Sequence, residues 1–175
     1  MGMYRYRTAG ALTLALLIAT GASGVSAAHQ SKAPTWITTK GKTVNLTLIA
    51  AYNNVQSGFN FDGGANGKMT ITVPRGDKVN VSFSNKAPIP HSAEVVGFAK
   101  KPASLTTFKP AFKGASSPDP TSGSPSGKTY KFSFTAAKTG KYLLVCAVPG
   151  HVAAGMWDNF VVSGSAKSGS IHFSK

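Results

Sequence analysis

Acidic side chains and cysteine are scarce in this chain of 175 residues. It has 5 carboxylates against 19 lysines and arginines, a formal net charge of +14, and a single cysteine, Cys146. One cysteine excludes an internal disulfide and any metal centre bridged by two thiolates. Four histidines are too few for an enzyme that needs several metal centres. No helical period of useful length follows residue 28, so the sequence favours an all-β domain.

The charge excess would ordinarily suggest a nucleic-acid-binding protein. Here the lysines are scattered, and Arg75 is the only arginine beyond residue 7. An acidic medium explains the composition better, because carboxylates would be protonated there while lysines keep their charge. We therefore expect a positive surface that attracts an acidic protein partner, and no nucleic acid.

Residues 1–28 have the layout of a secretory signal peptide. Arg5 and Arg7 precede an apolar stretch, and small residues follow up to Ala28. The alternative is an uncleaved membrane anchor, because the apolar segment approaches the roughly 20 residues that cross a bilayer. Both alternatives predict export to the periplasm or another extracytoplasmic compartment, and the second adds membrane association through this segment.

The remainder of the chain has the pattern of one β domain. Residues 29–42 form a polar lead, either a tether or an edge strand, and residues 43–175 form the domain. About seven or eight strands, joined by turns, predict an antiparallel β-sandwich. A segment rich in Pro, Ser and Gly at about residues 100–128 is predicted to be a long surface insertion. The predicted strands lie at residues 44–50, 69–73, 78–83, 95–98, 130–134, 141–146, 159–162 and near 171–173.

Four side chains could together bind one metal ion. Cys146, His151 and Met156 are spaced by five residues each, and His91 follows a Pro-Ile-Pro run. Each alone has an ordinary explanation, such as an inert buried thiol, a surface histidine or a core methionine. Together a thiolate, two imidazoles and a thioether are the donors of a blue-copper site. The set predicts one copper ion that changes between Cu(I) and Cu(II).

The residues flanking these donors are apolar or small. Pro149, Gly150 and Trp157 are predicted to surround the ligands, and Ser92 is predicted to change the hydrogen bonding near the thiolate sulfur. Excluding water favours Cu(I), so the reduction potential is expected to be raised. A flat apolar patch is predicted beside His151, where electrons are exchanged with the partner. Its residues are Val152, Ala153 and Ala154.

The pattern Cys-x-x-Pro-Gly-His-x-x-x-Gly-Met, followed by an aromatic residue and a strand, resembles the copper-binding loop of the cupredoxins. Within them it is most similar to rusticyanins and sulfocyanins, over about residues 60–162. The resemblance implies a cupredoxin-like, antiparallel or mixed Greek-key β-sandwich. It also implies that His91, Cys146 and His151 are equatorial copper ligands and Met156 the axial one.

The resemblance further implies a function. Such proteins are exported single-copper electron carriers of acid-living organisms, working with cytochrome c and a terminal oxidase, and are not enzymes. The alternative is a copper storage or delivery protein. A closed Cys/His/His/Met site argues against it, because such carriers tend to use open, exchangeable coordination.

Overall fold

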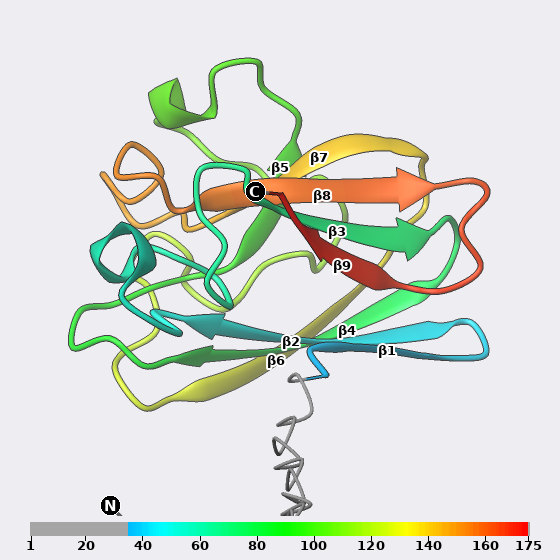
Figure 1. Ribbon diagram of the computed structural model, residues 1–175, viewed down its shortest axis with the longest axis horizontal. Coiled ribbons are helices and arrows are strands. Elements are labelled where there is room, and N and C mark those ends of the chain that lie inside the picture. The colour runs from blue at the N-terminus through cyan, green and yellow to red at the C-terminus, as the bar shows by residue number, and fades with distance from the viewer. Residues whose placement is uncertain (1–34, 175) are drawn as a thin grey trace, which may run out of the picture. The chain divides into compact units, whose positions relative to one another are not determined.

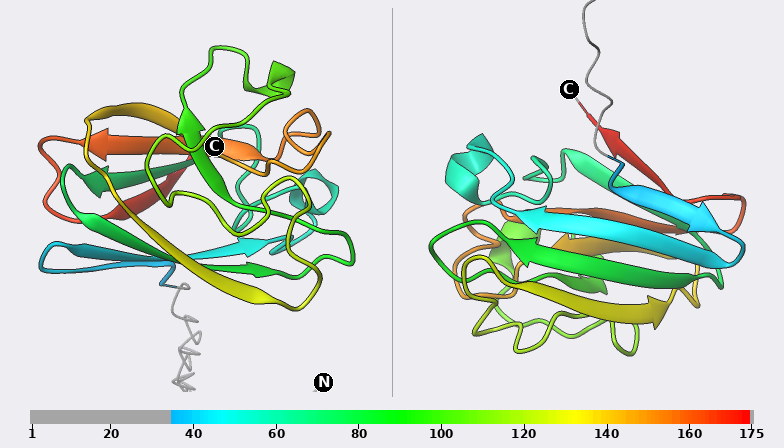
Figure 2. Two further views of the ribbon diagram at one scale, coloured as in Figure 1. Left: turned by 180° about the vertical axis from the view of Figure 1, so that it is seen from behind. Right: turned by 90° about the horizontal axis from the view of Figure 1, so that it is seen from below.

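In the computed structural model, residues 35–174 are described and form a sandwich of two β-sheets (Figure 1, Figure 2). One sheet has the strand order β1-β2-β4-β6 and the other β5-β7-β8-β3-β9. The predicted all-β sandwich is confirmed, with nine strands rather than seven or eight. The strands are β1 (Ile37–Lys40), β2 (Thr43–Ala50), β3 (Met69–Pro74), β4 (Lys78–Asn85), β5 (Glu94–Gly97), β6 (Thr129–Thr135), β7 (Gly140–Val145), β8 (Trp157–Ser163) and β9 (Ser170–Phe173).

Both sheets are mixed. β2 runs parallel to β4, and β3 runs parallel to β8, while the other neighbouring pairs are antiparallel. β1 lies at a sheet edge inside the segment predicted to be a tether or an edge strand. The predicted signal peptide and residues 29–34 lie outside the described residues. No helix within residues 35–174 is long and apolar enough to span a membrane.

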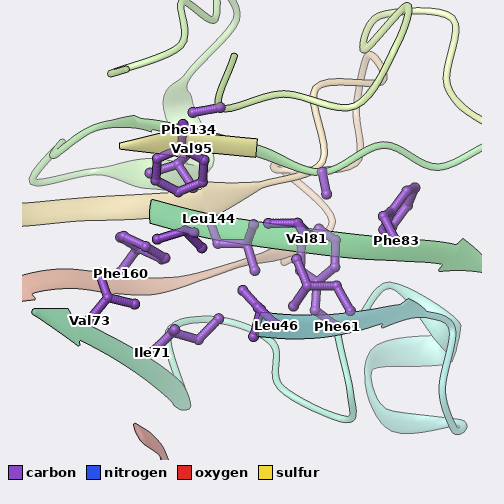
Figure 3. Packing of buried hydrophobic residues seen from close by; sticks show 14 of the residues in the cluster. Leu46, Phe61, Ile71, Val73, Val81, Phe83, Val95, Phe134, Leu144 and Phe160 are labelled. Carbon is purple, nitrogen blue, oxygen red and sulfur yellow. The ribbon is translucent and has the colours of Figure 1, made fainter. Parts of the chain in front are cut away.

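The core lies between the sheets because the strands alternate buried and solvent-facing side chains. β4 alternates in this way along its whole length, and it buries Val79, Val81 and Phe83. These side chains meet Leu144 from β7 and Phe160 from β8 in one cluster (Figure 3). Each such side chain contributes about 1.5–3 kcal/mol when it leaves water, so this cluster holds the two sheets together.

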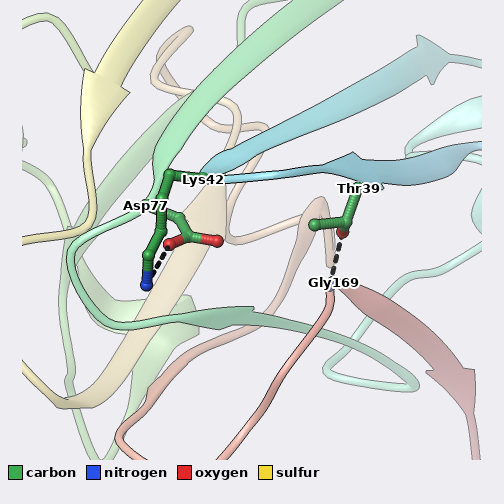
Figure 4. Close-up of polar contacts among 4 residues, drawn as sticks. All are labelled: Thr39, Lys42, Asp77 and Gly169. Atoms are coloured by element: carbon green, nitrogen blue, oxygen red, sulfur yellow. Dashed lines mark hydrogen bonds and ion pairs between the residues drawn. The ribbon is translucent and has the colours of Figure 1, made fainter.

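Polar contacts join the turns at one end of the sandwich (Figure 4). The Gly169 N–H donates to Thr39 Oγ1 over 2.8 Å, which ties the β8–β9 connection to β1. Lys42 Nζ lies 3.8 Å from Asp77 Oδ1 and ties the β1–β2 turn to the turn before β4. This end adjoins the start of β4, whereas the predicted ligand His91 follows the end of β4. The metal site is therefore built at the other end.

Two long irregular segments reach the end where β4 finishes. Residues 51–67, the 51–67 loop, include the 3-10 turn η1 (Val55–Gly58), and the insertion, residues 100–128, includes η2 (Pro102–Ser104). The insertion does not project freely, because it pairs with β5. The Val95 N–H donates to Ala115 O and the Ala111 N–H donates to Val95 O, over 2.9 and 2.8 Å.

Candidate metal centre

Three predicted ligands come together around one point. Cys146 Sγ lies 3.8 Å from His91 Nδ1 and 3.3 Å from His151 Nδ1, and the two Nδ1 atoms are 3.1 Å apart. A trigonal metal ion with bonds of about 2.0 Å to nitrogen and about 2.3 Å to thiolate, as zinc makes, needs separations of about 3.5–3.7 Å. The observed triangle is close to that size. It is the only cluster of this kind among residues 35–174.

The β7–β8 connection places two of these ligands. Cys146 follows β7 directly, and β8 begins one residue after Met156. The loop closes on itself, since the Cys146 N–H donates to Met156 O over 3.2 Å and the Met156 N–H donates to His151 O over 2.9 Å. Gly155 has φ +97, and a Cβ there would lie 2.7 Å from the Asn66 side chain. Glycine is therefore required at this position in the loop.

Met156 is fully buried, and its backbone is fixed by the two hydrogen bonds that close the loop. Its thioether is the predicted axial donor. This role stays a prediction, to be tested by spectroscopy.

The protonation states of the donors suit a metal ion. Burial, with a smaller contribution from the charge of the neighbouring His151, lowers the pKa of His91 to about 4. Burial also lowers the pKa of His151, so that both imidazoles are neutral and can ligate above mildly acidic pH. Burial raises the pKa of the Cys146 thiol, and a bound cation would hold it as the thiolate.

Ser92 contacts the sulfur, as predicted from its place after His91. Its backbone N–H donates to Cys146 Sγ over 3.2 Å, and its hydroxyl oxygen lies 3.7 Å from the same atom. The hydroxyl oxygen also accepts from the Ala147 N–H over 2.9 Å. Ser92 therefore links the His91 segment to the Cys146 segment.

Phe59 contacts both imidazoles, a feature that the sequence analysis missed. Its ring stands edge-on to His151 with centroids 5.0 Å apart and to His91 at 6.0 Å. It belongs to the 51–67 loop, which also touches the β7–β8 loop through Gln56, whose Nε2 donates to Ala154 O over 2.9 Å. Figure 1 shows both segments at the same end of the sandwich. An aromatic residue within a loop rich in Gly and Asn was the only sign of this contact in the sequence.

Asn85 fixes the backbone that carries His91, and it too was missed. Its Nδ2 donates to Ile89 O and to Ser124 O, both over 2.8 Å, and its Oδ1 accepts from the Ala87 N–H. Ser124 in turn exchanges two backbone hydrogen bonds with His91. The end of the insertion therefore fixes the main chain of a predicted ligand.

The remaining predicted residues are distributed around the centre. Pro149 and Gly150 are exposed in the β7–β8 loop, and Trp157 is half-buried against the cluster that includes Val152. The buried Trp157 indole N–H has no hydrogen-bond partner within residues 35–174. His172 lies exposed on β9 and is not part of the donor triangle, while His29 lies outside the described residues.

The predicted electron-exchange patch needs a correction. Val152 is 2% exposed, because residues of the insertion cover it. Ala153 is exposed and Ala154 is half-buried. The three residues therefore do not form the flat surface that was predicted, since the sequence did not reveal that the insertion folds over the loop.

A triangle of one buried thiolate, one buried imidazole and one half-buried imidazole at the end of a two-sheet β-sandwich defines a cupredoxin. With Met156 in the same loop, the arrangement fits a single type 1 copper site.

Comparison with known proteins makes the assignment more specific. Residues 30–169 match the sulfocyanin (SoxE) domain, and the chain therefore belongs to the sulfocyanin family. The sulfocyanin of Sulfolobus acidocaldarius is 29% identical over 128 residues, which are 70% of this chain and 64% of that protein. The matched stretch thus spans less than two thirds of the sulfocyanin. The rusticyanin of Acidithiobacillus ferrooxidans is 30% identical over 134 residues, 72% of this chain and 80% of the rusticyanin.

Solved structures agree with this assignment. A crystal structure of rusticyanin variants superposes with a TM-score of 0.55 at 26% identity, covering 71% of this chain and 80% of the rusticyanin. Reduced auracyanin from Roseiflexus castenholzii has a TM-score of 0.50 at 23% identity, covering 71% of this chain and 99% of the auracyanin. The likeness to auracyanin concerns the fold alone.

Proposed function

We propose that this protein carries single electrons between redox partners through one copper ion at His91, Cys146, His151 and Met156. The observation that carries the proposal is the closed donor triangle, in which His91 is 1% exposed and Cys146 is 0% exposed. A copper ion held there supplies reversible one-electron chemistry. The protein supplies a donor set whose positions are fixed before the metal arrives.

The residues around the donors limit their movement when the charge of the site changes. Ser92 holds the sulfur, Ser124 holds the main chain of His91, and Phe59 lies against both rings. Small displacement between the two oxidation states favours fast electron exchange. Burial of Cys146 and Met156 excludes water, and this favours the lower charge of Cu(I) and raises the reduction potential.

Storage or delivery of copper is less well supported. A delivery protein needs donors that a second protein can reach, and His91 and Cys146 are buried. An enzymatic role is also less well supported, because residues 35–174 hold one such metal-binding cluster. We therefore do not assign a catalytic residue.

We propose an extracytoplasmic, acidic environment and a respiratory role between cytochrome c and a terminal oxidase. Among residues 35–174, Asp119 is the only exposed carboxylate, while lysines occupy much of the surface. Such a surface keeps its charge in acid and attracts an acidic partner. The respiratory role is what the resemblance to sulfocyanins and rusticyanins implies.

The test is spectroscopic. The copper-loaded protein is expected to show intense visible thiolate-to-Cu(II) absorption, a type 1 EPR signal and reversible bleaching in a redox titration. Cys146→Ser should abolish all three, because the thiolate is the source of the colour. His172→Ala is the matched control and should retain them. Copper binding without a coloured Cu(II) state that can be reversibly reduced would favour storage instead.

A further inference from the structure

The insertion and the β7–β8 loop enclose a groove of about 460 Å³. On one side it is lined by Ala103, Leu105 and Phe108 of the insertion. On the other side it is lined by the loop that carries His151, from Pro149 to Ala153. The lining is mostly apolar, and it includes Gly150 and Val152, the neighbours of the half-buried predicted ligand His151.

The groove is already formed in the free protein. Leu105 and Phe108 pack against a buried cluster made of Val96, Leu143, Val145 and Val152. Val152 is the member of this cluster that also lines the groove. Backbone hydrogen bonds tie the insertion to β5 at Ala111 and Ala115, after the wall, and the packing of Leu105 and Phe108 anchors the wall itself. A rigid, half-enclosed apolar groove binds a partner without a large cost of ordering.

The charges around the groove select the partner. Lys100 and Lys101 precede the lining segment of the insertion and Lys109 follows it, and all three are exposed. Asp119, close in sequence to the lining residue Thr121, is the only nearby exposed carboxylate. These three lysines do not line the groove but lie within three residues of its insertion wall, so the charge beside that wall, here called the rim, is positive. A second copy of this chain, with the same formal charge of +14, would be repelled.

We propose that this groove docks an acidic segment of the redox partner, with an apolar side chain of the partner seated between the insertion and the β7–β8 loop. The proposal rests on the electron-carrier function and replaces the flat patch at residues 152–154. It gives the insertion a role, since without it Val152 would be exposed and no groove would exist. An occupant would touch Gly150 and Val152 and so reach the neighbourhood of His151.

The test uses one partner in two charge states, cytochrome c and its succinylated, acidic derivative. Binding is measured by calorimetry with both proteins reduced, so that no electron moves. Electron transfer from the ferrous haem to the oxidised copper protein is measured by stopped flow. Hydroquinone, a small uncharged reductant, reports whether the copper site itself accepts electrons.

Two variants alter the groove and two serve as matched controls. Lys101→Glu with Lys109→Glu reverses the rim charge, and Lys40→Glu with Lys131→Glu makes the same charge change on the four-stranded sheet. Ala103→Trp fills the groove, and Ala137→Trp adds the same bulk near the start of β7. Melting temperatures confirm that each variant is folded.

The groove variants are expected to weaken binding of succinylated cytochrome c and to slow its electron transfer by about tenfold. The controls and the hydroquinone rates should be close to those of the unmodified protein. Equal effects in groove and control variants, or tighter binding of unmodified cytochrome c, would overturn the proposal. Failure of hydroquinone to reduce the unmodified protein would instead count against the electron-carrier function, and the binding data would still decide the groove.

Discussion

The 51–67 loop and the insertion lie at the same end of the sandwich, yet they are held in different ways. The 51–67 loop contains five of the six non-glycine residues with positive φ within residues 35–174, and the insertion contains the sixth, Asp119. Such a conformation costs about 1 kcal/mol or more per residue. In the 51–67 loop, side chains such as Gln56 and Asn60 add hydrogen bonds to those of its backbone, whereas the insertion pairs with β5 and with His91 chiefly through its backbone.

The difference separates two tasks at the metal centre. The strained 51–67 loop brings an aromatic ring to the imidazoles, a position that regular structure would not reach. The relaxed insertion fixes the main chain of His91 and shapes the groove. We therefore expect changes on the insertion side to affect global stability, and changes at Phe59 to affect metal retention.

The largest effect is expected for Asn85→Ala, which breaks the link to the insertion. Three hydrogen bonds to backbone groups would be lost, including the one to buried Ser124. The free energy of unfolding should fall by about 4 kcal/mol, measured by denaturant titration of the copper-free protein. Asn45→Ala, at an exposed asparagine of β2, should change it by less than about 0.5 kcal/mol. Similar losses in both variants would contradict the proposed role of Asn85.

The next prediction concerns how stability depends on pH. It compares Asp62 of the 51–67 loop with Asp119 of the insertion. Asp62 in the 51–67 loop is 2% exposed, and burial raises its pKa to about 7, against an opposing hydrogen bond from the Ile49 N–H and the charge of Lys86. This folded-state pKa lies above the unfolded value of about 3.9. The contribution of Asp62 to the free energy of unfolding is therefore fully present below about pH 4 and is lost as the pH rises to about 7.

The loss of unfolding free energy should amount to about 4 kcal/mol, and Asp62→Asn should remove that part of its dependence on pH. Thermal or chemical unfolding across this pH range measures it. Asp119→Asn makes the same charge change at an exposed site and should leave the profile unaltered. Part of the pH dependence of stability should remain in both variants, since burial also raises the pKa of Asp158 to about 8 and raises the pKa of Glu94. Greatest stability near neutral pH, with collapse in acid, would disprove this prediction and the proposed acidic environment.

The smallest effect on stability is expected for Phe59→Leu. The edge-on contacts with both imidazoles are lost, at a cost of about 1 kcal/mol. Copper should nevertheless dissociate faster in the presence of a chelator, because the imidazoles of His91 and His151 no longer pack against the Phe59 ring. Phe132→Leu, at a half-buried aromatic of β6 away from the ligands, should cost a similar free energy without faster release. Equal release rates in the two variants would remove Phe59 from the metal site.

The sequence predicted the ligand loop well because its chemistry is local. Cys146, His151 and Met156 lie within eleven positions of one another, and a proline and glycines fix the turns between them. The strands were also predictable, since alternation along β4 and β6 is a property of each segment alone. Pairing between distant strands, such as β2 with β4, depends on the whole sheet and was not predictable.

Residues that act through tertiary contacts were missed for the same reason. Nothing local distinguishes Asn85 from Asn45, although one is buried and bonded three times and the other is exposed. The burial of Val152 depends on an insertion that carries no regular pattern of its own. His91 was identified only because it could complete a donor set already suggested by the loop.

His91 and Cys146 are 55 positions apart along the chain, and this separation dictates the order of maturation. Seven of the nine strands within residues 35–174 precede the thiol in the chain. Until the thiol is made, the chain offers a single imidazole of the triangle, which is a poor competitor for scarce copper. The complete triangle therefore forms only after Cys146 and His151 have been made and have folded against His91, so copper retention can report that these segments have come together.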